Sequence, residues 1–367
     1  VENFGVGSSV TINNNTVSID PTSDLTQGET YYISYPSGAF TNTAGDVSYV
    51  GTAYTFGVKP LEYNYWTWGF NAPGKLGLNN TVSYSSPVQL PGSWNKIYDT
   101  MPWSSAFIAA AKTPNSLWMW GDNEYGELGQ NSTIKYSSPV QIPGTNWAQV
   151  QVANKGSIAI KVDGTMYAWG DNTNGALGQN SPTSSHVSSP VQIPGTTWDS
   201  SADKKLSAGL SMYSAIKTDG TLWTWGYNES GQLGVNYRNP DGVSSPVQVP
   251  GTTWDGVWST GWFSLAIKTD GTLWSWGKNA NGNLGDNNPA TTDRSSPTQI
   301  PGTNWSMATN GGYVGLALRT DGTLWAWGDN ELGELGQNAG ANARKSSPTQ
   351  IPGTTWNYVQ GGHRMVV

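Results

Sequence analysis

The chain has 367 residues, enough for two or three domains, with a net charge of −7 and only 12% charged residues. Because it contains no cluster of lysine and arginine, the composition argues against a nucleic-acid-binding protein and against a polybasic membrane anchor. The absence of cysteine excludes disulfides, thiolate metal sites and cysteine nucleophiles.

The remaining composition bears on the fold class. The chain holds 46 glycines and 20 tryptophans, and turn formers are far more frequent than helix formers, which predicts an all-β protein. No apolar run approaches the ~20 residues that cross a bilayer, so we expect no direct membrane insertion. The chain begins with valine and shows no signal peptide, so we expect that a leader was removed or that this is a fragment.

Residues 1–60 lack the internal repeat that fills the rest of the chain. Alternating apolar and polar residues, separated by turn formers, predict strands at 9–12, 16–19, 30–33 and 54–56. The run from Thr16 to Val58 resembles the C-terminal half of bacterial Ig-like domains of the S-layer and adhesin type. The resemblance is carried by Val-Ser-Ile-Asp-Pro at 17–21, Gly-Glu-Thr-Tyr-Tyr at 28–32, Ala-Gly-Asp at 44–46 and Tyr-Thr-Phe at 54–56.

This resemblance implies a partial Ig-like β-sandwich over residues 1–60. The earlier strands of such a sandwich are missing, so we expect the chain to be cut at this end. Residues 59–62, Lys-Pro-Leu-Glu, form a short linker into the repeats.

From residue 61 onward the chain repeats itself six times. Each repeat carries a Trp-Gly pair, then Ser-Ser-Pro, then a further Trp, and successive Trp-Gly pairs are 49 to 56 residues apart. The Trp-Gly pairs begin at Trp68, Trp120, Trp169, Trp225, Trp276 and Trp327.

Residues 264–276 show how one repeat is built. The segments 264–268 and 272–276 are strand-like, and Asp270-Gly271 between them is a strong hairpin signal. Because strand side chains alternate, Trp274 and Trp276 face the same way, and we expect that face to pack against a neighbouring unit. Most of the tryptophans are therefore predicted to be structural core.

The order Trp-Gly-x-Asn, Gly-x-Leu-Gly, Pro-Val-Gln and Asp-Gly-Thr-Leu-Trp resembles the repeat of the regulator-of-chromosome-condensation (RCC1) family, most completely at 225–234. The resemblance covers residues 61–367 and implies a β-propeller, a ring of four-stranded blades that usually number seven. We expect each blade to span two successive Trp-Gly anchors. Since the chain stops at 361–367, where the next strand and hairpin should follow, we expect the polypeptide to continue, and six and seven blades both remain open.

The variable part of each repeat is one loop between Trp-Gly and Ser-Ser-Pro. These loops are equivalent in every repeat, so they should line one side of the ring, where a rigid scaffold commonly carries binding residues. They hold non-repeating aromatic and cationic residues of the kinds that anchor interfaces. The alternative is that these are scattered surface residues that fill gaps in the loops. The loops are 70–84, 122–136, 171–187, 227–243, 278–294 and 329–345; the candidate ligand-binding residues are Phe70, Tyr84, Tyr125, Tyr136, Tyr227, Tyr237, Arg238, Arg344 and Lys345, together with the three tryptophans outside the repeat pattern, Trp103, Trp258 and Trp262.

No motif predicts chemistry. The chain has no Gly-x-Ser-x-Gly elbow, no P-loop and no calcium-binding loop, and its two histidines are far apart in sequence. We therefore predict no catalytic residues, no metal site and no cofactor. Paired carboxylates that meet across a propeller face stay possible, although solvated loop acids are the default interpretation of the four that occupy matching loops: Glu124, Glu127, Glu331 and Glu334.

The favoured function is a non-enzymatic recognition module on an extracellular, cell-surface or virion appendage, which binds a protein or a cell-surface glycan and belongs to a larger multidomain chain or assembly. An Ig-like spacer followed by a propeller suits a stalk that presents a recognition head. The alternatives are a secreted protein-binding inhibitor, since one bacterial β-lactamase-inhibitory protein shares the RCC1-like propeller, and a polysaccharide-acting enzyme. Nucleotide exchange on a small GTPase with chromatin binding is disfavoured by the acidic charge.

Overall fold

The computed structural model describes residues 10–13, 16–19, 21, 25, 30–34, 54–57, 63–98, 106–112, 115–181, 185–288, 292–337 and 343–360. The chain divides into two compact units, Val1–Tyr63 and Asn64–Val367, each of which is described by itself.

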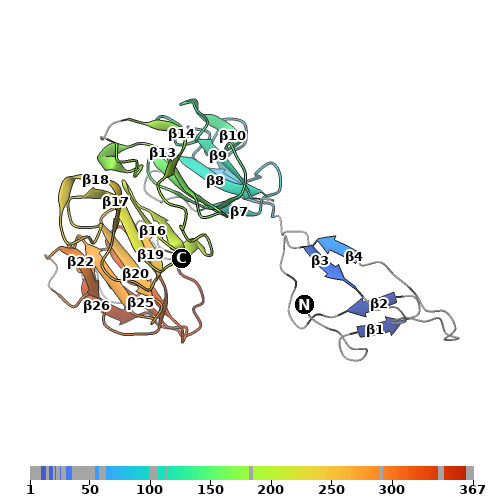
Figure 1. Ribbon diagram of the computed structural model, residues 1–367. Coiled ribbons are helices and arrows are strands. Elements are labelled where there is room, and N and C mark those ends of the chain that lie inside the picture. Colours follow the sequence, from blue (N-terminus) through green and yellow to red (C-terminus); the bar gives the residue numbers. More distant parts are fainter. Residues whose placement is uncertain are drawn as a thin grey trace. The chain divides into compact units, whose positions relative to one another are not determined.

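The N-terminal unit contains two antiparallel strand pairs. Strand β1 (Val10–Asn13) pairs with β2 (Thr16–Ile19), and β3 (Thr30–Ile33) pairs with β4 (Tyr54–Gly57) (Figure 1). The four predicted strands are confirmed. Two strand pairs do not show an Ig-like sandwich, which stays a prediction.

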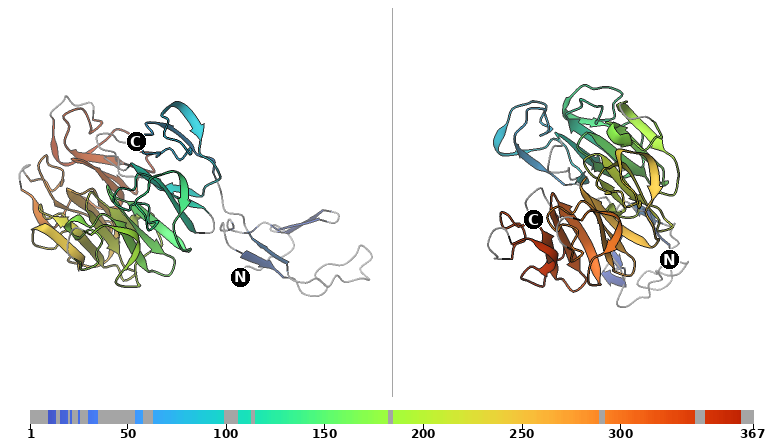
Figure 2. Two further views of the ribbon diagram at one scale, coloured as in Figure 1. Left: turned by 90° about the horizontal axis from the view of Figure 1, so that it is seen from above. Right: turned by 90° about the vertical axis from the view of Figure 1, so that its left-hand side faces the viewer.

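The repeats form β-sheets that follow one another around a common axis (Figure 2). In the described part of the chain there are five four-stranded antiparallel meanders and one two-stranded pair, β5–β6. The strands are β5 (Trp66–Gly69), β6 (Tyr84–Gln89), β7 (Lys96–Tyr98), β8 (Phe107–Lys112), β9 (Ser116–Gly121), β10 (Tyr136–Gln141), β11 (Trp147–Val152), β12 (Gly156–Lys161), β13 (Met166–Gly170), β14 (Val187–Ile193), β15 (Leu206–Ala208), β16 (Met212–Ile216), β17 (Leu222–Asn228), β18 (Asn239–Gln248), β19 (Trp254–Ser259), β20 (Phe263–Lys268), β21 (Leu273–Gly277), β22 (Arg294–Gln299), β23 (Trp305–Gly311), β24 (Val314–Arg319), β25 (Leu324–Gly328) and β26 (Lys345–Gln350).

Helical structure in the described residues is limited to two short 3₁₀ turns, η1 (Thr173–Gly175) and η2 (Asp203–Lys205). None of the helices found there has the length and apolar character needed to cross a membrane.

Each four-stranded sheet contains one Trp-Gly anchor, in its third strand; Trp276-Gly277, for example, ends β21. The expectation that a blade spans two anchors was therefore wrong. The chain leaves a sheet after the Ser-Ser-Pro strand through a Pro-Gly turn, so the next anchor belongs to the next sheet. The predicted hairpin between the second and third strands is confirmed: Gly271 has φ +76°, and the Asp270 carboxylate accepts hydrogen bonds from Thr272 at 2.9 and 2.6 Å.

The core lies between successive sheets. In all five four-stranded sheets the anchor Trp is at most 2% exposed, and its indole N–H donates to a loop carbonyl of the preceding sheet at 2.6–3.0 Å. The second glycine of Gly-x-Leu-Gly touches that indole; at Gly178, with φ +66°, a Cβ would lie 2.9 Å from Nε1 of Trp225. The residues that recur in every repeat thus form the same interface between each pair of successive sheets.

Candidate functional site

The variable loops join the third and fourth strands, and the turns between the first and second strands lie at the same end because the strands alternate in direction. Contacts confirm this placement: Gln232 of one loop donates to the carbonyl of Gly261, in such a turn, at 3.0 Å. We call this end of the repeat unit the loop face. The Asp-Gly hairpins lie at the opposite end.

A buried asparagine holds the base of each loop. The Asn of Trp-Gly-x-Asn accepts a hydrogen bond from the backbone N–H of the Leu in Gly-x-Leu-Gly at 2.8–3.2 Å in all six repeats. These asparagines are at most 3% exposed. The loop bases are therefore constant, and the side chains farther along each loop are free to differ.

Around Tyr125 the loop face gathers four side chains from two sheets. Lys155 Nζ donates to the Tyr125 hydroxyl at 3.0 Å and lies 4.3 Å from the centre of its ring. His186 packs edge-on against the same ring, with centroids 4.8 Å apart, and its Nδ1 lies 3.1 Å from Oδ1 of Asp171. The hydrogen bond to Tyr125 raises the pKa of Lys155, which keeps its charge. We call Tyr125, Lys155, Asp171 and His186 the Tyr125 cluster.

Beneath this cluster lies Glu127, which is 3% exposed. Its carboxylate accepts the backbone N–H of Tyr125 at 2.8 Å, and its burial raises the carboxyl pKa to about 7. The expectation of a solvated acid was wrong for Glu127. The loop folds over its side chain because the anchor Trp169 hydrogen-bonds the Glu127 carbonyl at 2.6 Å and draws this residue into the interface.

A second group on the loop face joins β15–β18 and β19–β22. The Tyr227 hydroxyl donates to the Glu229 carboxylate, Lys278 Nζ lies 4.5 Å from the centre of the Trp262 ring, and half-exposed Arg238 lies 3.5 Å from Asp293. Tyr237 is exposed beside them.

The other predicted residues are spread around the repeat unit. Phe70 is 65% exposed with Lys75 above its ring, and Arg344 pairs with Asp329 at 3.1 Å. Tyr84, Tyr136 and Lys345 are half-buried at the starts of fourth strands. Trp258 lies in β19 and faces the axis, away from the loops. Trp103 lies outside the described residues.

Sequence reasoning missed Lys155 and His186. Lys155 sits in a turn between first and second strands, at the place where the sheet β19–β22 has Gly261-Trp262, and only the paired strands reveal that this turn reaches the neighbouring loop. His186 was set aside because two histidines make no metal site, although its loop position was visible.

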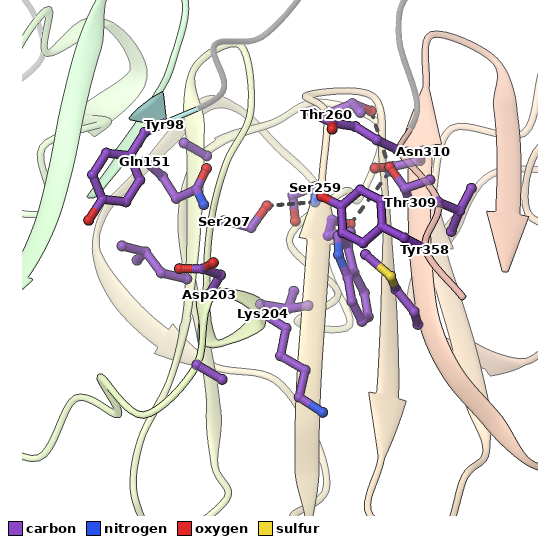
Figure 3. A pocket seen from close by; sticks show the side chains of 18 of the residues that line it. Tyr98, Gln151, Asp203, Lys204, Ser207, Ser259, Thr260, Thr309, Asn310 and Tyr358 are labelled. Atoms are coloured by element: carbon purple, nitrogen blue, oxygen red, sulfur yellow. Dashed lines mark hydrogen bonds between the residues drawn. The ribbon is translucent and has the colours of Figure 1, made fainter. Parts of the chain in front are cut away.

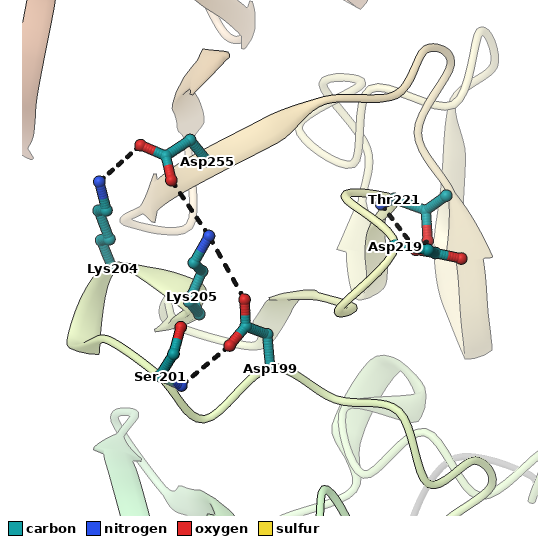
Figure 4. Close-up of polar contacts among 7 residues, drawn as sticks. All are labelled: Asp199, Ser201, Lys204, Lys205, Asp219, Thr221 and Asp255. Atoms are coloured by element: carbon teal, nitrogen blue, oxygen red, sulfur yellow. Dashed lines mark hydrogen bonds and ion pairs between the residues drawn. The ribbon is translucent and has the colours of Figure 1, made fainter. Parts of the chain in front are cut away.

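Apart from the loop face, a cavity with a volume of about 670 Å³ lies on the axis of the repeat unit (Figure 3). The first strands of all five four-stranded sheets line it. At one end η2 connects three sheets through ion pairs. Lys96 of β7 pairs with Asp203. Lys204 pairs with Asp255 of β19 at 2.6 Å, and Lys205 lies between Asp255 and Asp199 at 3.1 and 3.4 Å (Figure 4).

The repeat geometry agrees with a comparison of the sequence against known families. The model of the regulator of chromosome condensation (RCC1) repeat matches residues 64–101, 115–160, 163–199, 219–260, 270–318 and 321–367, more than half of the chain. The chain belongs to the RCC1 repeat family. Its repeat unit is accordingly an RCC1-like β-propeller.

Individual relatives support the family at low identity. The ultraviolet-B receptor UVR8 of Arabidopsis thaliana is 26% identical over 293 residues, which cover 78% of this chain and 65% of UVR8. Human E3 ubiquitin-protein ligase HERC2 is 24% identical over 80% of this chain but only 6% of HERC2. The RCC1 repeat chain thus spans less than two thirds of either relative. The structure of Prp20p from Saccharomyces cerevisiae, at 20% identity, has a TM-score of 0.66 and covers 79% of this chain and 73% of Prp20p, which shows a shared fold.

Proposed function

We propose that this propeller is a non-enzymatic recognition module that binds a protein partner through its loop face. The observation that carries the proposal is the Tyr125 cluster, in which an aromatic ring, a lysine, a histidine and an aspartate from two sheets are held in mutual contact at the protein surface. Aromatic and cationic side chains of this kind dominate the binding energy of protein interfaces. Within the family, yeast Prp20p binds Gsp1p and histones.

The way the cluster is held favours binding. Tyr125 is fixed by Lys155 on its face and His186 at its edge, so a partner does not have to order these side chains when it docks. The buried asparagine at each loop base removes further freedom from the backbone. A preorganised surface of this sort loses less entropy on association than flexible loops do.

The charges of the loop face support recognition in preference to acid–base catalysis. Four of its aspartates each lie within 3.5 Å of a basic side chain, so these carboxylates are engaged in ion pairs and hydrogen bonds. The pairs are Asp122–Lys135, Asp171–His186, Asp293–Arg238 and Asp329–Arg344.

The proposed setting is an extracellular, cell-surface or virion appendage, in which the N-terminal segment acts as an Ig-like spacer. This rests on the absence of cysteine, the low charge and the strand-rich segment before the repeats. A glycan partner, a secreted inhibitor and a polysaccharide-acting enzyme are the competing functions that an experiment must separate.

The test compares the intact chain with a Tyr125→Ala/Lys155→Ala variant in capture from candidate host surfaces. The control is Val162→Ser, at an exposed position beside an Asp-Gly hairpin on the opposite end. We expect one partner to be retained by the intact chain and the control and lost by the double variant, with little dependence on salt because the face is not strongly basic. Equal capture by all three proteins would refute the loop face, and release of reducing ends from a polysaccharide by the intact chain would refute the non-enzymatic assignment.

A further inference from the structure

The axis of the propeller is lined by a ring of residues at one register. In each of the five sheets, one residue of the first strand pairs with the third residue of the second strand and lines the axial cavity. Trp258, for example, pairs with Leu265, and Thr309 pairs with Leu316. We call these five residues the axial ring. They are Tyr98, Gln151, Ser207, Trp258 and Thr309.

The axial ring differs in character from the positions beside it. The residue just before each ring member is apolar and packs between sheets, as Val257 does before Trp258 and Val150 before Gln151. The ring positions carry five different side chains, and every one of them can hydrogen-bond while none is charged. Tyr98 and Trp258 also pack against core clusters, whereas no core cluster of the described residues includes Gln151, Ser207 or Thr309, which face the cavity with polar side chains.

Trp258 provides a flat apolar surface within this polar ring. It follows a glycine at the previous axis-facing position: a Cβ at Gly256 would lie only 2.6 Å from Cη2 of Trp258, so the indole lies against the bare backbone of β19. Its counterparts in the other sheets are smaller or polar. An indole in this position offers a stacking surface and an N–H at its edge.

One buried amide in β11, behind the ring, has no hydrogen-bond partner among the described residues. Two residues before Gln151 in β11, and outside the cavity lining, Gln149 is 3% exposed, and neither atom of its side-chain amide makes a hydrogen bond in the described structure. A buried amide without a partner is unusual, because it loses its contacts with water. Because Gln149 lies behind the ring, its side chain is polar support for the wall and does not itself face the ligand.

The cations of the cavity are already paired. Lys96 and Lys204 are the lysines of the lining, and they face Asp203 and Asp255 at the η2 end. The opposite end is lined by neutral Thr260 and Asn310 (Figure 3). A ligand between these ends therefore meets hydroxyl and amide groups and aromatic rings, and needs no charge of its own.

We propose that the axial cavity is a binding site for a neutral saccharide of one or two sugar units. Its apolar C–H face stacks on Trp258, and its hydroxyls exchange hydrogen bonds with Gln151, Ser207 and Thr309. The volume of about 670 Å³ falls within the range of roughly 300–1,000 Å³ that small-ligand sites occupy. This site lies on the axis, meets the loop face at Thr260 and does not depend on the proposed protein partner.

The test is calorimetric titration of the full chain with glucose, galactose, mannose, N-acetylglucosamine, maltose and cellobiose, with glucuronate and glucosamine as charged counterparts. We expect at least one neutral sugar to bind at one site per chain. Trp258→Ala and Gln151→Leu should each weaken that binding by at least about tenfold. The matched control is Trp223→Ala, which removes another half-buried tryptophan, in β17 and outside the cavity lining, and should leave sugar affinity unchanged.

A thermal-unfolding midpoint recorded for each variant separates lost binding from lost folding, and Gln151→Leu serves if Trp258→Ala does not fold. Absence of binding by every neutral sugar overturns the proposal. So does sugar binding that survives both axial variants, or that disappears with Trp223→Ala. Preferred binding of glucuronate or glucosamine contradicts the assignment of a neutral ligand.

Discussion

The tryptophan of the Trp-Gly motif is buried in one region of the repeat unit and exposed in another. Trp225, in the third strand of a complete sheet, is fully buried, whereas Trp68, in the two-stranded pair β5–β6, is 59% exposed. Trp225 donates to the carbonyl of Ala176 in the preceding loop. In the described structure, the sheet that holds Trp68 consists of β5 and β6. The motif therefore fixes the position of the tryptophan in its strand, and packing against the loop of the preceding sheet buries its ring.

The other half of this interface shows the same contrast. In the loop between β21 and β22, a Cβ at Gly282 would lie 3.0 Å from Cα of Ser346 in the next sheet, whereas a Cβ at Gly333 in the last loop would meet no described atom within 4 Å. The interface is thus made of a loop socket and a tryptophan from the next sheet. Each half keeps its local shape when the partner half is not packed against it.

The largest expected effect is on the buried tryptophan. Trp225→Ala should lower the free energy of unfolding by about 3–5 kcal/mol, because it opens a cavity in the packed core and leaves the Ala176 carbonyl without its donor. Trp276→Ala should behave alike, and Trp68→Ala should cost less than about 1 kcal/mol because its ring is largely exposed. Chemical denaturation of the three variants measures this; similar midpoints for Trp68→Ala and Trp225→Ala would remove the distinction between the two regions.

The second prediction concerns the buried acid Glu127. Gln232 occupies its place in the sheet β15–β18, where the amide accepts from Ser230 and donates to Gly261. Burial raises the pKa of Glu127 from 4.5 to about 7, so the folded state holds its proton more tightly than the unfolded chain. Its contribution to stability is fully present below pH ~4.5 and is lost as the pH rises through ~7.

Glu127→Gln should abolish this slope and stabilise the protein by up to about 3 kcal/mol at pH 8. Denaturation curves of the parent and the variant between pH 4.5 and 8 provide the measurement. Gln232→Glu is the matched control and should introduce a slope of the same sign. A parent whose stability rises across that interval would contradict the protonated, Gln-like role of Glu127.

The smallest effect concerns the cation stacks at the hairpin end. Lys268 lies 4.8 Å from the ring centre of Trp254 and 4.7 Å from that of Trp274. Lys268→Met keeps the aliphatic stem and removes the charge, so it should cost about 0.5–2 kcal/mol. The comparison is Lys75 over the exposed ring of Phe70 in the first variable loop, 5.6 Å from the ring centre, and Lys75→Met should have no measurable effect. Equal losses of unfolding free energy in both variants would show that burial does not strengthen the cation–π contacts.

The sequence predicted what depends on local chemistry. Turn residues predicted the Asp270-Gly271 hairpin, and the recurring residues of the repeat predicted the strand positions and the burial of Trp276. The site was predicted less well, because contacts such as Lys155 on Tyr125 depend on which strand ends meet. Trp258 was grouped with the loop residues since its strand register, and hence its axial position, becomes visible only when the second strand is paired with the first.

The central claim, that the sheets provide stability and the loop face provides recognition, is tested most directly by hydrogen exchange of the chain with and without its captured partner. The account predicts slowed exchange in the loops 122–136 and 171–181 and in the turn around Lys155. The Asp-Gly hairpins at 163–164 and 219–220, at the opposite end, should exchange as in the free chain. Protection of those hairpins with unchanged exchange in the loops would contradict the account.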